Sequence, residues 1–320
     1  MRVLQHSSPG TVSIIEMPVP EPEPDEVLVR VEAVSTCPQW DLHIISGVPM
    51  FADRPLEYPY VPGEPGHEFA GVVEQVGSAV GQLHDGQRVV AWRDPGGRRQ
   101  GAYAEFVCVK GDHLLPIPAD IPIESIAPLE LAMCVQVSFD QLEDVSALRD
   151  KSIAITGLGP AGLIAVQMAN AYGARNVVAI EPEADRRALG RTLGANEVFA
   201  PGDPELADRQ FDTGLDTTGL KPVIEDLMAR TRSTVAIFGV LRERIEFGPE
   251  KWWGNFRLMG YGEHNKHAAV RALDLVKQGK LDLGSLVSSR CTFETYVAGI
   301  EDLRNKTAIK VLVFPGESPE

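Results

Sequence analysis

The sequence predicts an α/β protein with two domains, one rich in β-strands and one built on a parallel sheet. The chain has 320 residues, more than one hydrophobic core usually supports, and its 44% of apolar residues suffice for two cores. The pattern of apolar residues changes near Lys151 and again near Ser285. We therefore expect one domain at 1–145, completed by the tail 285–320, and the other at 146–284.

Alternating strand patterns dominate the first domain. In the segment VLVRVEAV, residues 27–34, valines recur at the period of a half-buried strand. Glycines and the turn Asp94-Pro95-Gly96-Gly97 separate these segments. The expected strands are Val27–Val34, Phe69–Val76, Arg88–Trp92 and Ala102–Val109.

In the second domain, short apolar strands alternate with segments of helical period, which is typical of βαβ units. The expected strands are Ile153–Thr156, Val177–Ile180, Glu197–Phe199, Leu215–Asp216 and Thr234–Phe238. The expected helices are Ala161–Tyr172, Ala184–Leu193 and Pro222–Ala229. The tail is expected to add a helix at Tyr296–Leu303 and a strand at Lys310–Phe314.

Charge and composition exclude several classes of partner. The net charge is −15, from 45 acidic against 30 basic residues, and no basic run is present, so nucleic acid and anionic membranes are not expected partners. The N-terminus lacks the apolar stretch of a secretory signal, and no segment is long enough to span a bilayer. Four scattered cysteines suit a reducing compartment. We expect a cytoplasmic protein.

The motif Gly157-Leu158-Gly159-Pro160-Ala161-Gly162 follows a strand and precedes a helix. In this context a G-x-G-x-x-G sequence is typical of a Rossmann dinucleotide site. The first glycine allows a tight turn, the second lets the backbone approach the pyrophosphate, and the third lets helix and strand pack closely. The helix N-terminus offers free N–H groups to the phosphates.

The expected cofactor is NAD. Glu181 ends the next strand, where a carboxylate accepts hydrogen bonds from the adenosine ribose and repels a 2′-phosphate. Arg186 and Arg187 follow closely and could hold such a phosphate, so NADP stays open as the less favoured cofactor.

Potential metal ligands gather in the first domain. Cys37, Asp41 and His43 follow one strand, and His67 and Glu68 come some 30 residues later, with Glu130 and Cys134 further on. Cysteine, histidine and carboxylate together suit zinc, which takes three protein ligands in catalytic sites. Spacing alone leaves another interpretation open, in which Cys37 is a small buried residue and His67 a hydrogen-bonded turn residue.

The stretch from Gly66-His67-Glu68-Phe69-Ala70-Gly71 to Gly77 and Val80 resembles the zinc signature of the medium-chain dehydrogenase/reductase superfamily, in its zinc-dependent alcohol and polyol dehydrogenase branch. Further blocks of similar sequence are residues 26–31, 37–47, 86–89, 101–106, the glycine motif and 309–311. The resemblance implies a GroES-like substrate domain, completed by the C-terminal tail, beside the Rossmann domain.

The resemblance also implies roles for single residues. Cys37, His67 and Glu130 would bind one catalytic zinc, with Glu68 as an alternate ligand. Asp41 would orient the metal site, and His43 would carry protons between the cofactor ribose and solvent. Glu181 and Arg186 would bind the ribose, Gly239 and Val240 would lie near the nicotinamide, and Lys310 would bind the pyrophosphate. The cofactor-binding set is Gly157, Gly159, Pro160, Ala161, Gly162, Glu181, Arg186, Gly239, Val240 and Lys310.

The sequence departs from the family pattern at three points. Cys37 and Asp41 are four residues apart instead of three, which turns a helix by a further 100° or so and could misplace the thiol. Gln39 stands where the family has a hydroxyl residue that relays the substrate proton, so Thr36, a water or Glu68 would have to serve. Residues 93–100 contain no cysteine, so no structural zinc is expected.

The sequence therefore predicts a zinc-dependent oxidoreductase that transfers a hydride between an alcohol, polyol or sugar and NAD. Two alternatives remain: a zinc-free NAD(P)H-dependent quinone or enone reductase of the same superfamily, which the Cys37 spacing favours, and a non-catalytic nucleotide-binding protein. A homo-oligomer, dimer or tetramer, is expected, with Trp252, Trp253 and Phe256 as candidate interface residues.

Overall fold

The computed structural model describes residues 1–51, 53–93 and 99–316. The chain forms two compact units, one of Met1–Leu131 with Leu283–Glu320 and one of Ala132–Asp282. The first boundary falls inside helix α2 (Leu129–Asp144), whereas the sequence pattern places it at 145. The two boundaries differ because α2 continues from the first unit into the second, whereas the sequence-based boundary lies just before the first strand of the βαβ pattern. The turn expected at 94–97 lies outside the described residues.

The first unit contains a sheet of strand order β14-β15-β3-β4-β5-β7, with β6 also paired to β3. A hairpin of β1 (Arg2–Ser8) and β2 (Thr11–Glu16) accompanies it. The strands are β3 (Glu26–Ser35), β4 (Glu68–Val76), β5 (Arg88–Ala91), β6 (Phe106–Lys110), β7 (Leu114–Pro116), β14 (Val287–Thr292) and β15 (Lys310–Phe314). Since β15 pairs with both β14 and β3, the tail rejoins the first unit, as expected.

Strand β6 begins later than the pattern predicts, at Phe106 instead of Ala102. The reason is local: the N–H groups of Ala102 and Tyr103 donate to the carbonyl groups of Gly66 and Gly63, at 2.7 and 3.0 Å. A Cβ on Gly63 would lie 2.1 Å from the Gly101 oxygen, so only glycine permits this close approach. The segment around Tyr103 is thereby fixed against the residues that precede His67.

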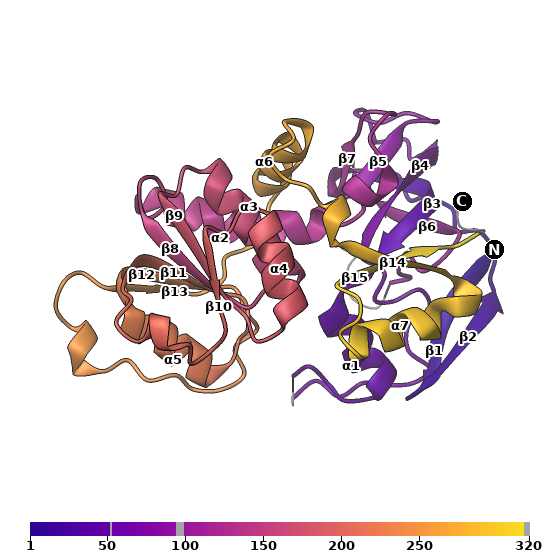
Figure 1. Ribbon diagram of the computed structural model, residues 1–320. Helices are drawn as coiled ribbons and strands as arrows, with labels where there is room; N and C mark the ends of the chain where they lie inside the picture. The colour runs from indigo at the N-terminus through magenta and orange to yellow at the C-terminus, as the bar shows by residue number, and fades with distance from the viewer. Residues whose placement is uncertain (52, 94–98, 317–320) are drawn as a thin grey trace. The chain divides into compact units, whose positions relative to one another are not determined.

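Two helices of the first unit come from distant parts of the chain and lie side by side. Helix α1 (Pro38–Ser46) follows β3, and α7 (Tyr296–Arg304) precedes β15; Figure 1 shows α7, in yellow, beside α1 and the β1–β2 hairpin. The core between these helices and the sheet includes Val34, Phe69, Tyr103, Tyr296 and Val313.

The second unit is a parallel sheet of order β10-β9-β8-β11-β12-β13, with α3 and α4 on one face and α5 on the other (Figure 1). This confirms the Rossmann-type fold. The strands are β8 (Ser152–Thr156), β9 (Asn176–Ile180), β10 (Glu197–Phe199), β11 (Phe211–Asp216), β12 (Thr231–Ile237) and β13 (Arg257–Met259). The helices are α3 (Pro160–Ala171), α4 (Ala184–Thr192), α5 (Lys221–Arg230) and α6 (Lys266–Lys277).

Short 3-10 helices lie at Gly111–His113, Ile123–Ser125, Pro204–Leu206, Pro249–Lys251, Gly284–Leu286 and Phe293–Thr295. Within the described ranges, none of the helices has the length and apolar character to cross a bilayer.

Candidate functional site

The register of one strand pair brings three potential metal ligands together. Ser35, at the end of β3, pairs with Glu68, at the start of β4, so the residues that follow Ser35 lie beside those that precede Glu68. Cys37 caps the N-terminus of α1, and His67 directly precedes β4. The ligand atoms of Cys37, His67 and Glu68 all lie within 4.8 Å of one another.

His67 is oriented by its backbone neighbour. Its Nδ1 lies 2.6 Å from the carbonyl oxygen of Pro65, and since a carbonyl only accepts, Nδ1 carries the hydrogen. The other ring nitrogen, Nε2, lies 4.0 Å from Oε2 of Glu130, whose side chain is 8% exposed. This arrangement leaves Nε2 as the atom that could bind a metal, with Nδ1 fixed by its hydrogen bond as in most protein metal sites.

The electrostatics of the cluster favour a cation. Burial alone lowers the pKa of His67, but the Cys37 sulfur and the carboxylates of Glu130 and Glu68 outweigh it and raise that pKa well above its usual value. The same negative groups would stabilise a bound metal ion. Thiolate, imidazole and carboxylate oxygen form a donor set that fits zinc.

The extra residue between Cys37 and Asp41 is absorbed by regular helix. Asp41 N–H donates to the Cys37 carbonyl at 2.9 Å, and Cys37 N–H donates to Oδ2 of Asp41 at 2.8 Å. Residues four apart on a helix share a face, so the longer spacing still lets Asp41 fold back onto the cysteine. Burial raises the pKa of the Asp41 carboxyl, and hydrogen bonds from Tyr296, Tyr103 and Cys37 counteract that rise.

The carboxylate of Glu68 forms an ion pair with a buried lysine. Lys310 Nζ donates to Oε2 of Glu68 at 2.5 Å, and also to Ser35 Oγ and the Thr36 carbonyl. The other carboxylate oxygen, Oε1, is buried and has no hydrogen-bond partner among the described residues. An unsatisfied buried oxygen near the two potential ligand atoms of Cys37 and His67 fits the expected role of Glu68 as an alternate ligand.

His43, which is expected to carry protons to solvent, lies on α1 near Gln39, which cannot relay a proton, and Thr36, a candidate for the relay, lies in the core. Nδ1 of His43, which is half-buried, lies 2.8 Å from the Val48 carbonyl, and Gln39 is exposed. Thr36 is fully buried, and its hydroxyl accepts the N–H of Val311 at 2.9 Å.

The glycine motif has the geometry of a phosphate-binding turn. Gly157 has φ of +85°, and a Cβ on Gly162 would lie 1.9 Å from the Gly157 oxygen, so both positions require glycine. Gly159 is the N-cap of α3, no side chain caps this helix end, and a Cβ there would meet no atom within 4 Å. A helix N-terminus with free N–H groups, such as those of Ala161 and Gly162, is a favourable site for a phosphate group.

The residues expected at the ribose lie next to this turn. Glu181 Oε2 accepts the N–H of Leu158, within the motif, at 2.6 Å, and Oε1 accepts the N–H of Glu183 at 3.0 Å. Arg187 donates to the backbone carbonyl of Glu181, whereas the buried Nε of Arg186 has no hydrogen-bond partner within the described chain.

The remaining expected cofactor residues divide between the units. Gly239 follows β12, and its N–H donates to the Asp216 carbonyl; Val240 lies against Gly219, where a Cβ would approach the Val240 oxygen to 2.3 Å. Lys310 belongs to the first unit and its side chain is fully buried. Its three ammonium hydrogens are used there, so binding of the pyrophosphate by Lys310 stays a prediction.

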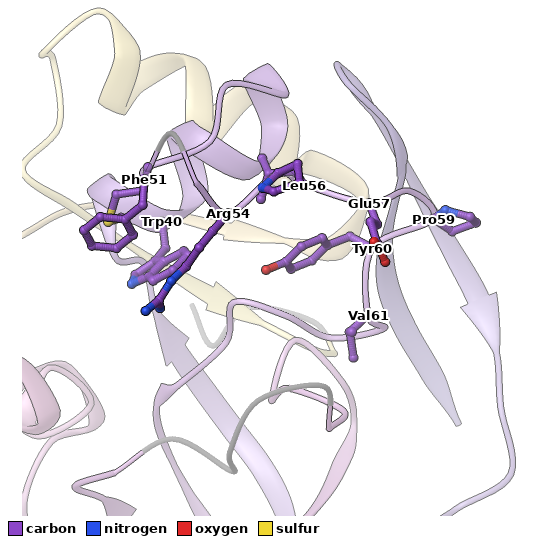
Figure 2. A pocket seen from close by; sticks show the side chains of 10 residues that line it. Trp40, Phe51, Arg54, Leu56, Glu57, Pro59, Tyr60 and Val61 are labelled. Atoms are coloured by element: carbon purple, nitrogen blue, oxygen red, sulfur yellow. The ribbon is translucent and has the colours of Figure 1, made fainter.

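A pocket of about 490 Å³ lies in the first unit. It is lined by Trp40, Met50, Phe51, Arg54, Pro55, Leu56, Glu57, Pro59, Tyr60 and Val61. Figure 2 shows the ring of Tyr60 directed toward the group of Trp40, Phe51 and Arg54. Trp40 lies in the first turn of α1, three residues after Cys37, the N-cap residue of that helix. Trp92 is outside this pocket: it is buried, and its indole N–H donates to the Asp112 carbonyl.

Sequence patterns did not indicate three residues that surround Asp41. The hydroxyl groups of Tyr103 and Tyr296 donate to Oδ1 of Asp41, at 2.9 and 2.7 Å, and His6 lies 3.5 Å from the Tyr296 hydroxyl. Tyr103 belongs to a block that resembles the family, but nothing in the local sequence signals its contact with Asp41.

Two family models match the chain. Residues 23–119 match the alcohol dehydrogenase GroES-like domain, and residues 160–278 match the zinc-binding dehydrogenase model. L-threonine 3-dehydrogenase of Rhizobium rhizogenes is 30% identical over 351 aligned positions, which cover 98% of each chain. The chain belongs to the medium-chain dehydrogenase/reductase superfamily, in the zinc-dependent alcohol and polyol dehydrogenase branch. It is an oxidoreductase of that type.

Solved structures have the same fold. Galactitol-1-phosphate dehydrogenase from Escherichia coli has a TM-score of 0.84 at 25% identity, covering 98% of this chain and 100% of that one. A Sinorhizobium meliloti protein described as a zinc-binding dehydrogenase, solved bound to NADP, has a TM-score of 0.85 at 26% identity, covering 98% and 99%.

Proposed function

We propose that the protein oxidises an alcohol, polyol or sugar hydroxyl to a carbonyl, reversibly, with one catalytic zinc ion and NAD. The observation that carries the proposal is the convergence of Cys37, His67 and Glu68, whose ligand atoms lie within 4.8 Å of one another. Glu130, 4.0 Å from His67, completes a set of cysteine, histidine and carboxylate. Relatives named for threonine and galactitol 1-phosphate support a hydroxyl-bearing substrate.

Cys37, His67 and Glu130 would hold the metal, with Glu68 as the alternate ligand. When bound, zinc supplies a Lewis acid that polarises the substrate oxygen, and the nicotinamide supplies the hydride acceptor. Asp41 keeps the cysteine backbone in place, and the Pro65 carbonyl fixes the tautomer of His67. His43, at the solvent side of α1, would pass the hydroxyl proton to water.

The pocket beside α1 would receive the remainder of the substrate. Its walls combine aromatic rings with Arg54 and Glu57, which suits a molecule with both carbon and polar surface. The guanidinium carbon of Arg54 lies 5.5 Å from the centre of the Phe51 ring.

The preference for NAD rests on Glu181, whose carboxylate repels a 2′-phosphate. Two observations favour NADP instead: the buried Nε of Arg186 has no hydrogen-bond partner in the described chain, and one relative was solved with NADP bound. The alternative of a zinc-free reductase rested on the extra residue after Cys37. Helix α1 accommodates that residue, and the hydrogen bond between Cys37 N–H and Asp41 is present.

We also propose a homodimer, formed in the reducing cytoplasm where four free thiols are stable. Trp252 and Trp253 are 71% and 78% exposed, and β13 is an edge strand of the second unit's sheet. Light scattering of the wild type and of Trp253→Ser tests this proposal: a dimer weakened by the substitution supports it, and a wild-type monomer contradicts it.

Metal content tests the catalytic proposal. Elemental mass spectrometry of chelator-free protein should find about one zinc per chain, lost in Cys37→Ala and His67→Ala. Cys108→Ala, which removes a buried thiol of β6 remote in sequence from the ligands, is the matched control and should keep the metal. Zinc-free protein that still binds the nicotinamide cofactor would favour the zinc-free reductase; bound NAD with no turnover of any alcohol or carbonyl would favour a non-catalytic role.

A further inference from the structure

Asp41 is the centre of a buried hydrogen-bond network that reaches the metal-binding cysteine. Its side chain is fully buried and accepts three hydrogen bonds. Oδ2 accepts the N–H of Cys37 at 2.8 Å, and Oδ1 accepts the hydroxyl groups of Tyr103 and Tyr296 at 2.9 and 2.7 Å. One oxygen of the carboxylate thus contacts the ligand residue, and the other contacts the two tyrosines.

The two tyrosines come from opposite ends of the first unit's sequence. Tyr103 follows the turn that packs against Gly63 and Gly66, and Tyr296 is the first residue of α7. Their side chains are among the largest that are fully buried, and their rings meet edge to face, with centroids 5.2 Å apart. Figure 1 shows how α7 reaches α1, the helix that carries Asp41.

The hydroxyl groups constrain Asp41 more than ring packing alone would. A phenylalanine at either position would fill the same core volume but leave Oδ1 with one hydrogen bond fewer in a site without water access. Two donors from separate elements also fix the plane of the carboxylate, since Oδ1 must accept from both directions. With Oδ1 held, Oδ2 stays in contact with Cys37 N–H.

We propose that Tyr103 and Tyr296 are positioning residues of the metal site, which hold the Cys37 thiolate in place through Asp41. The inference rests on the proposed metal site. It assigns a function to the C-terminal segment, because α7 contributes one of the two hydroxyl groups although it supplies none of the proposed ligands.

Metal affinity, measured without turnover, tests the proposal. Each of Tyr103→Phe and Tyr296→Phe should weaken zinc binding in a chelator competition by roughly tenfold, the lower end of what loss of a ligand's supporting hydrogen bond costs. In protein loaded with Co²⁺, the thiolate charge-transfer absorption should shift or weaken. Tyr58→Phe is the matched control, because the Tyr58 hydroxyl bonds the Ile44 carbonyl on the same helix but does not contact Asp41.

A double-mutant cycle separates positioning from general stability. In an Asp41→Leu background the side chain accepts no hydrogen bond from Cys37 or from the tyrosines, so removing the tyrosine hydroxyl groups should change metal affinity no further. Wild-type affinity in both single variants, or an equal loss in the Asp41→Leu background, overturns the inference while the proposed function stands. A wild type that binds neither zinc nor Co²⁺ overturns the proposed function and this inference together.

Discussion

Lys310 and Glu68 form an ion pair that is almost completely removed from solvent, with Nζ 2.5 Å from Oε2 and side-chain exposures of 0% and 1%. Nζ also donates to Ser35 Oγ at 3.1 Å and to the Thr36 carbonyl at 2.7 Å. One lysine from the last strand therefore connects the segment that leads into Cys37 with the residue that follows His67.

Replacing Lys310 should be strongly destabilising. Lys310→Met leaves the Glu68 carboxylate buried without its cation, and the loss of one partner of a buried pair costs about 3–5 kcal/mol of unfolding free energy. Urea unfolding of the metal-free protein measures this loss. The double variant Lys310→Met, Glu68→Leu should recover much of it, because no charge then stays unpaired. A loss below about 1 kcal/mol in the single variant would contradict a structural role for the pair.

Much of the parallel-sheet unit was predictable because its signals are local. Strand β10 and the start of helix α4 lie where the apolar period places them. The glycine motif was identified because both flanking elements are adjacent in sequence to Gly157 and Gly162. Helix α2 was missed because it joins the two units, so it follows neither the strand pattern before it nor the βαβ pattern after it.

The candidate metal site was predictable only in part. Resemblance indicated Cys37, His67 and Glu130; the register of β3 and β4 brings Cys37 beside His67, and Glu130, on α2, lies 4.0 Å from His67. The network behind them was not predictable, because Tyr296 and Asp41 are 255 positions apart and no local pattern records their contact. Long-range hydrogen bonds between single side chains depend on the complete fold.

The choice of cofactor can be tested at Glu181. A charge-assisted hydrogen bond contributes about 1.5–3 kcal/mol, so Glu181→Gln should raise the Kd for NAD by roughly 10-fold or more and leave NADP less affected. Binding of both cofactors by fluorescence titration gives the ratio. Arg191→Gln, at an exposed position in the last turn of α4, is a control. If NADP binds the wild type more tightly than NAD, the preference assigned to Glu181 is wrong.

The pocket beside α1 can be tested at Trp40. Trp40→Ala removes an aromatic wall, and the loss of such packing should raise KM about 10-fold with a smaller change in kcat, since the ring is expected to contact substrate and transition state alike. Steady-state kinetics with the best alcohol or polyol from a screen would measure it. Phe247→Ala, which removes a 51% exposed ring from the second unit, serves as control. An unchanged KM in Trp40→Ala would place the substrate elsewhere.

The buried His6 should make the fold sensitive to mild acid. Burial lowers the pKa of His6 from 6.5 to about 4, Nδ1 has no hydrogen-bond partner in the described chain, and the residue is 1% exposed. At pH 7 both folded and unfolded forms are neutral at this position, so it has no effect. As pH falls from about 6.5 toward 4, the unfolded chain takes up a proton that the folded protein resists, and stability declines by at most on the order of 3 kcal/mol.

His6→Phe, which keeps a ring against Tyr296, should remove this part of the acid sensitivity. Urea unfolding at pH 7 and pH 4.5 would show a smaller stability difference for His6→Phe than for the wild type. His84→Gln, at an exposed position, should behave as the wild type does. Equal pH dependence in His6→Phe and wild type would show that other groups govern the acid response. Those groups would also need a folded pKa below the unfolded pKa, because only such groups reduce the stability of the fold as the pH decreases.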